Sequence, residues 1–256
     1  ILKRDVEIAK IIKEAKLKFG YPQSISFYND KRFTETSREV LEVLGDISKM
    51  GVTLSLQTEN PEVLKAINRR NVTNEEIDNA IMWANKLNIS TSTELIFGLP
   101  YETKASYVNT LNKSIDRGFD AILSHALFIM DGIELNRPDI RKKYGINTKF
   151  RPLNSSYFKH ENEFIAEHEE VVVSTNTFNY EDYLDVRKLN FMFYSVFTLN
   201  FQKWFFQFIK FSNEISISDI FTKFMNPNPN SDWPSEYIKF VNDFTNAAKS
   251  ELFDTK

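Results

Sequence analysis

A strand, a tight turn and the start of a helix follow one another in the segment Glu94-Leu95-Ile96-Phe97-Gly98-Leu99-Pro100-Tyr101-Glu102-Thr103. Its apolar residues close a strand predicted for residues 90–97, and Gly98 with Pro100 interrupts that strand. A helix is predicted next, from about residue 104 to residue 116. A strand that turns directly into a helix is the building unit of a parallel sheet.

Comparable units lie on both sides of this segment. Further strands are predicted at residues 24–28, 52–58 and 121–128. Local signals mark the helices between them: Asn60-Pro61 opens a short helix, and two capping boxes open longer ones, Thr36 with Glu39 and Thr73 with Glu76. The first helix, which ends at Gly20, is expected to bury one apolar face, formed by Ile8, Ile11, Ile12, Ala15 and Phe19.

The alternation predicts an α/β fold, a partial (β/α) TIM-like barrel with parallel strands. Four strands are too few to close an eight-stranded barrel. The chain also opens on a helix that should follow a strand, so we expect a barrel segment whose beginning is missing. We assign residues 1–150 to this partial barrel, which lacks its first strands, and residues 151–256 to a mostly α-helical C-terminal appendage.

The second half of the chain has a different character. All seven glycines lie at or before Gly145. Beyond it we predict a short strand at residues 171–175, a long helical pattern at 181–211 and a last helix at 235–252. The aromatic run at residues 191–211 is interpreted as core rather than as a ligand box, because Phe and Trp are usually buried.

Composition excludes several function classes. The net charge of −3 gives no case for nucleic-acid binding, and the apolar run at 191–211 is interrupted by polar residues, which argues against a membrane span. The chain contains no cysteine, so within it there is no disulfide, thiolate nucleophile or cysteine-ligated metal. The three histidines, His125, His160 and His168, are too scattered for a metal motif. No signal peptide is recognised, and we expect a cytoplasmic protein.

Three segments carry a resemblance when taken in order: Ser55-Leu56-Gln57-Thr58 with Asn60 to Arg69, then Glu94 to Thr103, then Asp131-Gly132-Ile133-Glu134-Leu135. Together they resemble the radical S-adenosylmethionine (radical SAM) superfamily, over roughly residues 1–135. The opening, Lys3-Arg4-Asp5-Val6-Glu7-Ile8-Ala9 and then Gly20-Tyr21-Pro22, is similar to the branch that often carries an upstream cobalamin-binding domain.

The resemblance implies a partial six-stranded (β/α) barrel and a characteristic cofactor chemistry. In the family, a cysteine loop after the first strand ligates a four-iron four-sulfur cluster, and S-adenosylmethionine binds its free iron. Reductive cleavage of S-adenosylmethionine gives methionine and a 5′-deoxyadenosyl radical. Because this chain lacks cysteine, the resemblance places the cluster in a longer parent only, with cobalamin as a candidate cofactor there. The missing N-terminal part of the same protein is then the expected partner.

The resemblance also assigns cofactor-binding residues at the strand ends, where ligands of parallel barrels bind. Gln57 and Thr58 would hydrogen-bond the polar part of S-adenosylmethionine. Arg69 would meet the methionine carboxylate and Glu94 the ribose hydroxyls. The turn of Gly98, Leu99 and Pro100 would let the backbone approach the adenine. We expect these strand ends to converge on one nucleoside-sized hollow. No catalytic residue and no metal ligand is assigned.

Some of these residues also have an alternative, purely structural explanation. Arg69 would equally close a helix and pair with a surface carboxylate, while its neighbour Arg70 is expected to face solvent. Glu94 is alternatively an outward strand charge. Glu102 and Thr103 are interpreted as helix-start capping residues.

The sequence departs from the family at two further positions. Tyr101 stands where relatives often have glycine, and Ile133 where they often have threonine.

The leading hypothesis is the central and C-terminal part of a radical SAM enzyme, of iron–sulfur oxidoreductase or methyltransferase type, that acts on an unknown small molecule. Without the cluster motif, the chain alone would be inactive. An alternative is a non-catalytic, barrel-derived module that binds a nucleoside or a partner. A third, a different barrel enzyme with Glu94 as general base, rests on fold analogy alone.

Overall fold

The structure is a computed structural model that describes residues 2–27, 32–49, 51–230 and 232–255, without the side chains of residues 154 and 155. The chain divides into two compact units. Unit 1 comprises residues 1–56, 71–94 and 114–121, and unit 2 comprises residues 57–70, 95–113 and 122–256.

Unit 1 begins with two helices, α1 (Lys3–Phe19) and α2 (Glu35–Leu44), that pack on each other. Their shared core consists of Val6, Ala9, Val40 and Leu44. The predicted end of α1 is confirmed, because Gly20 adopts the left-handed conformation at its C-terminus. The predicted apolar face is wrong in part. Ile12 packs against the core as predicted, but Val6 and Ala9 form its centre, and the expected core residues Ile8, Ile11 and Phe19 are exposed.

The start of α2 differs from the prediction by two residues. Thr34 rather than Thr36 is the N-cap, and its hydroxyl accepts the N–H of Ser37 at 3.3 Å. The Ser37 hydroxyl accepts the N–H of Thr34 in return, so a short serine performs the task predicted for Glu39. The helix ends at Leu44, and Gly45 begins a short 3₁₀ turn, Gly45–Ile47.

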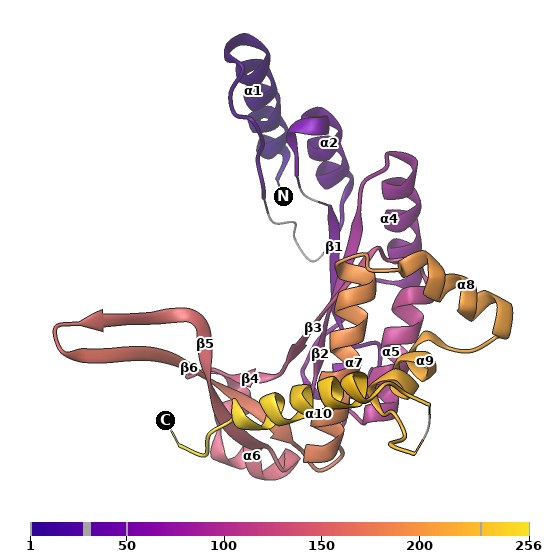
Figure 1. Ribbon diagram of the computed structural model, residues 1–256. Helices are drawn as coiled ribbons and strands as arrows, with labels where there is room; N and C mark the ends of the chain where they lie inside the picture. The colour runs from indigo at the N-terminus through magenta and orange to yellow at the C-terminus, as the bar shows by residue number, and fades with distance from the viewer. Residues whose placement is uncertain (1, 28–31, 50, 231, 256) are drawn as a thin grey trace. The chain divides into compact units, whose positions relative to one another are not determined.

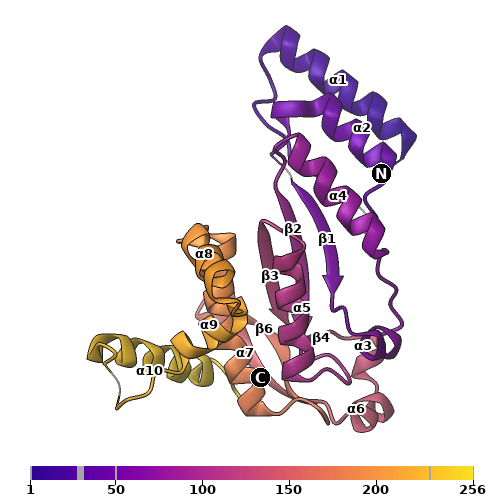
Figure 2. The same cartoon turned by 90° about the vertical axis from the view of Figure 1, so that its right-hand side faces the viewer.

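The predicted strand–helix repeats contribute a sheet of three strands. These are β1 (Val52–Gln57), β2 (Thr91–Phe97) and β3 (Ala121–Ala126), in the order β1-β2-β3. Figure 2 shows them side by side. The side chain of Thr53 meets that of Ser92, and two positions further along Ser55 meets Glu94. Contacts that advance in the same direction on both strands make β1 and β2 parallel, as predicted.

The pair β2 and β3 follows the same rule. Asp120 donates its N–H to Thr91 at the start of β2, and Leu127 donates to Phe97 at its end. The prediction of parallel strands is therefore confirmed for three strands. The fourth predicted strand, residues 24–28, is reduced to a single parallel bridge between Ile25 and Ser48, and its last residue lies outside the described residues.

The helices around this sheet follow their predicted local signals. In unit 1, α4 (Asn74–Lys86) starts at the predicted capping box of Thr73 and Glu76 and buries Ile77, Ala80, Ile81 and Ala84. In unit 2, α3 (Pro61–Ala66) starts at Asn60, whose side chain accepts the N–H of Glu62 at 3.0 Å. The helix α5 (Lys104–Asp116) has its predicted bounds.

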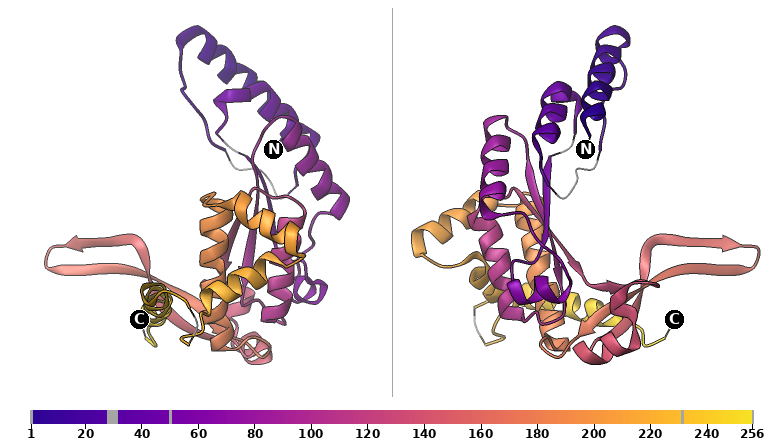
Figure 3. Two further views of the ribbon diagram at one scale, coloured as in Figure 1. Left: turned by 45° about the vertical axis from the view of Figure 1, so that its right-hand side comes forward. Right: turned by 180° about the vertical axis from the view of Figure 1, so that it is seen from behind.

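A second, antiparallel sheet in unit 2 was not predicted. It has the order β4-β6-β5, with β4 (Phe128–Ile129), β5 (Asn147–His160) and β6 (Glu163–Ser174). The predicted strand at 171–175 is only the buried end of β6. The outer part of the β5–β6 hairpin projects from the rest of unit 2 (Figures 1 and 3) and exposes both of its faces, so its sequence lacks the alternation that signals a strand. The predicted domain boundary after residue 150 falls within β5 and remains a prediction.

The C-terminal part is largely helical, as predicted. Its helices are α7 (Tyr180–Phe193), α8 (Lys203–Asn213), α9 (Ile217–Met225) and α10 (Ser235–Ser250), with α6 (Pro138–Tyr144) preceding the hairpin. The long helical pattern predicted for 181–211 is broken. A π-helical turn, Tyr194–Thr198, follows α7, and Asn200 and Gln202 are left-handed, which ends one helix and starts the next.

The aromatic run at 191–211 is core only in part. Phe193, Phe197 and Phe206 are buried and pack their rings on Phe221. Phe201, Trp204, Phe205, Phe208 and Phe211 are exposed, contrary to the prediction.

Parallel strands alternating with helices, followed by a mostly helical part, confirm the predicted α/β fold class. Among the helices that the structure describes, none combines the length and apolarity that a membrane crossing requires.

Candidate functional site

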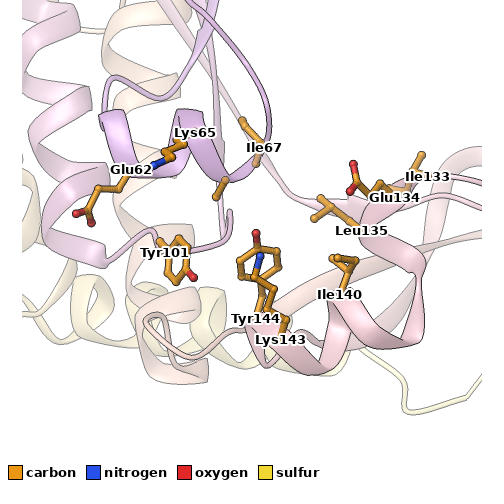
Figure 4. A pocket seen from close by; sticks show the side chains of 11 residues that line it. Glu62, Lys65, Ile67, Tyr101, Ile133, Glu134, Leu135, Ile140, Lys143 and Tyr144 are labelled. Atoms are coloured by element: carbon orange, nitrogen blue, oxygen red, sulfur yellow. The ribbon is translucent and has the colours of Figure 1, made fainter.

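A pocket of about 790 Å³ lies in unit 2 where the loops that follow the strands come together (Figure 4). Its walls come from α3, from the turn after β2, from the loop after β4 and from α6. All three segments of the family resemblance contribute to it. The lining residues are Glu62, Lys65, Ala66, Ile67, Tyr101, Ile133, Glu134, Leu135, Ile140, Lys143 and Tyr144.

The α3 wall is positioned by the chain that leaves β1. Gln57 ends the strand with a φ of 61°, a left-handed conformation that turns the chain sharply. The Thr58 hydroxyl then accepts the N–H of Asn60 at 3.2 Å, and Pro61 stands at the first position of the helix. The buried side chain of Val63 fastens α3 to a core that includes Leu99 and Val172.

The turn after β2 contributes a single side chain, Tyr101. Gly98 and Tyr101 both have positive φ, 84° and 65°. A Cβ atom at Gly98 would lie at an ordinary 3.6 Å from the carbonyl oxygen of Val172, so backbone conformation rather than space favours glycine there. The positive φ of Tyr101 means that glycine would suit this position and that tyrosine is strained at it.

The opposite wall is built on α6. Tyr144 is buried at the end of this helix, and its ring meets that of Tyr101 edge to face, with centroids 5.3 Å apart. Gly145 ends α6 in the left-handed conformation, and a Cβ atom there would collide with the side chain of Asn176. The ammonium of Lys143 lies 4.7 Å from the centroid of the Tyr144 ring, and a hydrogen bond to the Tyr144 hydroxyl raises the pKa of that lysine.

The chemistry of the pocket is mixed. It is lined by aliphatic side chains, by the two tyrosine rings and by a rim of both charge signs; the aliphatic residues are Ile67, Ile133, Leu135 and Ile140. The rim carries Glu62 and Glu134 as acids and Lys65 and Lys143 as bases. Such a lining suits an amphipathic ligand with charged groups at its ends. Within the described residues, no group of three His, Asp or Glu side chains is placed to hold a metal ion.

The seven predicted cofactor-binding residues are close in sequence to residues that line this pocket, but none of the seven is among the described lining residues. Thr58, Gly98, Leu99 and Pro100 are buried. Gln57 and Arg69 are partly buried, whereas Arg70 is exposed, as expected. Glu94 belongs to unit 1, where it accepts a hydrogen bond from Ser55 at 2.6 Å. The cofactor roles of all seven stay predictions.

Thr58, Gly98 and Leu99 come together around a residue whose burial the sequence did not reveal. The carboxyl group of Glu102 is fully buried, and neither of its oxygens has a hydrogen-bond partner of normal geometry among the residues that the structure describes. Burial raises the pKa of Glu102 to about 8. The Thr58 side chain and the N–H groups of Leu99 and Gly98 lie close enough to lower this pKa in part.

The predicted capping role of Glu102 is therefore wrong, and that of Thr103 is confirmed. Thr103 accepts the N–H of Ser106 at 3.1 Å, and the Ser106 hydroxyl accepts the N–H of Thr103 at 3.0 Å. The hydrogen bonds of Glu102 are made by its backbone. Its N–H donates to the carbonyl oxygen of Leu99, and its carbonyl oxygen accepts a hydrogen bond from the hydroxyl of Thr177 at 2.7 Å. Because Thr58, which lies beside the Glu102 carboxyl group, is distant in sequence, local signals do not show that this side chain points inward.

Comparison with known proteins bears on the family. Residues 2–113 match the Radical SAM superfamily. Over 150 residues the chain is 31% identical to the cobalamin-dependent radical SAM methyltransferase TokK of Streptomyces tokunonensis. It is also 31% identical over 150 residues to the 2-(S-pantetheinyl)-carbapenam-3-carboxylate methyltransferase of Streptantibioticus cattleyicolor. Each alignment covers 58% of this chain and 22% of the relative, so the chain spans about a fifth of the length of these proteins.

Solved structures with partial similarity include two radical SAM enzymes. One is the methyltransferase TsrM from Kitasatospora setae with cobalamin and a 4Fe–4S cluster bound; its TM-score is 0.40 at 16% identity, over 48% of this chain and 25% of that one. The other is coproporphyrinogen III oxidase (HemN) from Escherichia coli, with a TM-score of 0.38 at 24% identity, over 54% of this chain and 35% of that one. The resemblance predicted from the three sequence segments is confirmed for residues 2–113, the part of the chain that matches the Radical SAM superfamily.

Proposed function

We propose that this chain is the central and C-terminal part of a cobalamin-dependent radical SAM methyltransferase. The superfamily match and the two methyltransferase relatives support this proposal. The sequence left two enzyme types open, oxidoreductase and methyltransferase, and the two relatives favour the methyltransferase type. The observation that carries the proposal is the common pocket, because the three segments of the resemblance, together with α6, line one cavity at the strand ends.

The residues of this chain fit S-adenosylmethionine, but they cannot hold the 4Fe–4S cluster. Without cysteine, the chain cannot ligate a 4Fe–4S cluster, so the cluster ligands would lie elsewhere in the protein. S-adenosylmethionine fits better, because the strand ends offer a partly buried guanidinium at Arg69 and a turn at Gly98 of the kind that approaches a ligand. When bound, S-adenosylmethionine would supply the methyl group or the radical. No residue here is assigned to cobalamin.

Each predicted contact keeps its own role in the proposal. Arg69 would grip the methionine carboxylate, for which a guanidinium is suited, while Gln57 and Thr58 would bind neighbouring polar atoms. Glu94 would bind the ribose hydroxyls; its contact with Ser55 already fixes the carboxylate on β2. The turn from Gly98 to Pro100 would lie against the adenine.

We further propose a small-molecule substrate, handled in the cytoplasm without nucleic acid or a membrane as partner. The net charge of −3 supports the absence of a polyanion partner. One relative is named for a substrate with a carboxylate and a pantetheinyl arm. A ligand of that kind, with a carboxylate and a long arm of mixed polarity, matches the mixed lining of the pocket in unit 2.

The test uses the intact protein that contains this chain, purified without oxygen, with its iron–sulfur cluster reconstituted and with cobalamin added to accept the methyl group. Incubation with S-adenosylmethionine and a reductant should yield S-adenosylhomocysteine and 5′-deoxyadenosine, measured by liquid chromatography. Calorimetry with S-adenosylhomocysteine reports binding separately. Binding without either product would favour the non-catalytic module, and a folded protein with neither binding nor products would contradict both readings.

A further inference from the structure

The helix α8 carries an outward aromatic surface. The side chains of Trp204, Phe205, Phe208 and Phe211 are 77%, 53%, 66% and 86% exposed, and together we call them the α8 aromatic face. Leu199 and Phe201, 62% and 65% exposed, extend this face into the preceding turn. Single exposed apolar residues are ordinary, but a contiguous patch of this kind marks an interaction site.

The orientation of this face is set by the opposite side of the helix. Phe206 is buried, and its ring meets those of Phe221 and Phe224 at centroid distances of 5.1 and 5.9 Å. With Phe206 held inward, the residues at i, i+4 and i+7 (Trp204, Phe208 and Phe211) share the outward stripe. The helix therefore turns its larger aromatic side away from unit 2, at whose margin it lies in Figures 1 and 3.

We propose that the α8 aromatic face packs against the same face of a second copy of the protein, with the two α8 helices antiparallel about a two-fold axis. This inference goes beyond the proposed enzymatic function and does not depend on it. A self-complementary patch is what a two-fold interface requires, because the same residues meet from both sides.

The area of the patch agrees with a dimer. A large aromatic side chain offers on the order of 200 Å² for burial, so these six half to nine-tenths exposed side chains present roughly 800 Å² per copy. That is about what one partner contributes to a standard-size stable interface. Trp and Phe in the centre of such a patch are also the residue types that dominate interface energies.

The charges at the two ends of α8 agree with the antiparallel arrangement. Lys203 starts the helix, with its ammonium 5.7 Å from the centroid of the Phe197 ring, and Glu214 follows the last residue of the helix. If two antiparallel helices cross near Phe208, Lys203 of one copy lies next to Glu214 of the other, and the reverse pair forms at the other end. A parallel arrangement would instead place like charges together, which is unfavourable.

A lipid surface is the competing occupant of an amphipathic aromatic helix. Helices that bind membranes combine the apolar face with many Lys and Arg residues. Here α8 has two lysines, Lys203 and Lys210, and the chain carries a net charge of −3. These charges favour a protein partner over an anionic membrane.

The test measures the mass of the intact protein by light scattering coupled to size-exclusion chromatography, across a range of concentrations. We expect a dimer whose dissociation constant rises about thirtyfold or more in Phe208→Ser and in Trp204→Ser, which corresponds to a central hot-spot residue. Phe164→Ser is the matched control: this phenylalanine, on the β5–β6 hairpin, is 70% exposed but lies outside the patch. Its dissociation constant should equal that of the wild type. Circular dichroism checks that each variant is folded.

A charge exchange tests the orientation. Glu214→Lys should weaken the dimer, and adding Lys203→Glu in the same chain should restore it, because the exchanged pair again meets with opposite signs. A monomeric wild type, or a dimer that Phe208→Ser and Trp204→Ser leave unchanged, would overturn the proposal. So would a monomer that sediments with vesicles of phosphatidylcholine and phosphatidylserine and loses this binding in Phe208→Ser.

Discussion

Tyr101 and Tyr144 meet edge to face, their ring planes at 90° and their centroids 5.3 Å apart, and so join the turn after β2 to the end of α6. The contact holds Tyr101 in the left-handed region, with a φ of 65°. Tyr101 thus stands at a position whose backbone conformation favours glycine, and its side chain forms part of the pocket wall. The aromatic pair offsets the conformational strain that the side chain brings with it.

This balance predicts an unusual order of stability. Tyr101→Ala removes the aromatic contact but keeps the strained Cβ atom, whereas Tyr101→Gly removes both. We expect Tyr101→Gly to be more stable than Tyr101→Ala by about 1 kcal/mol, measured by urea unfolding. Tyr101→Phe, which keeps the ring, serves as control. Equal stability of the Gly and Ala variants would contradict the assigned backbone strain.

The buried carboxyl of Glu102 predicts a pH-dependent stability. Its pKa is about 8 when folded against 4.5 when exposed, so between these values the folded state keeps a proton that the unfolded state has released. Stability must then fall as pH rises from about 4.5 to about 8, by up to about 1.4 kcal/mol per pH unit, and the loss is complete above the folded pKa.

Glu102→Gln should remove this component, because an amide does not titrate. Urea unfolding at several pH values between 5 and 9 would show a steeper fall for the wild type than for the variant. The control, Glu62→Gln, changes an exposed carboxylate at the pocket rim and should follow the wild-type curve. Parallel curves for wild type and Glu102→Gln would mean that this carboxyl is already ionised in the folded protein.

The adjacent pair Arg69 and Arg70 allows a matched test of the cofactor proposal. Arg69 is partly buried and Arg70 exposed, yet both carry the same charge. In the intact protein we expect Arg69→Ala to weaken binding of S-adenosylmethionine by about tenfold to a hundredfold, the usual effect of a lost charge-assisted hydrogen bond. Calorimetry measures the affinity, and iron analysis should show an unchanged cluster content. An equal loss in Arg70→Ala would indicate a general charge effect instead of a specific contact.

Gly145 is predicted to be required for the packing of α6. It is left-handed, and a Cβ atom would collide with Asn176, whose amide donates to the carbonyl oxygen of Lys143 at 3.0 Å. Gly145→Ala should destabilise the protein by about 2 kcal/mol more than Gly118→Ala. Gly118 is the control because its φ is also positive, at 88°, but its Cβ would enter open space. Thermal unfolding of the two variants distinguishes strain alone from strain with a collision.

Local chemistry accounts for what could be read from the amino-acid order. Asn60 with Pro61, Thr73 with Glu76 and the stop at Gly20 act through contacts within one helical turn, so their positions agree with the structure. The parallel strands β1 and β2 were likewise visible as short apolar runs between helices. The family resemblance rested on the same local segments, which is why it needed no coordinates.

Contacts between distant residues were decided only by tertiary structure. The Glu102 carboxyl group points inward beside Thr58, a residue distant in sequence, and the outward direction of the α8 aromatic face depends on Phe206 reaching Phe221. Hydrophobicity alone assigned Trp204 and Phe211 to the core, because it records what a side chain prefers and not which side of a helix its neighbours occupy. The local sequence therefore determined most helices, strands and turns. Which face of each element is buried was determined by contacts between elements that are distant in sequence.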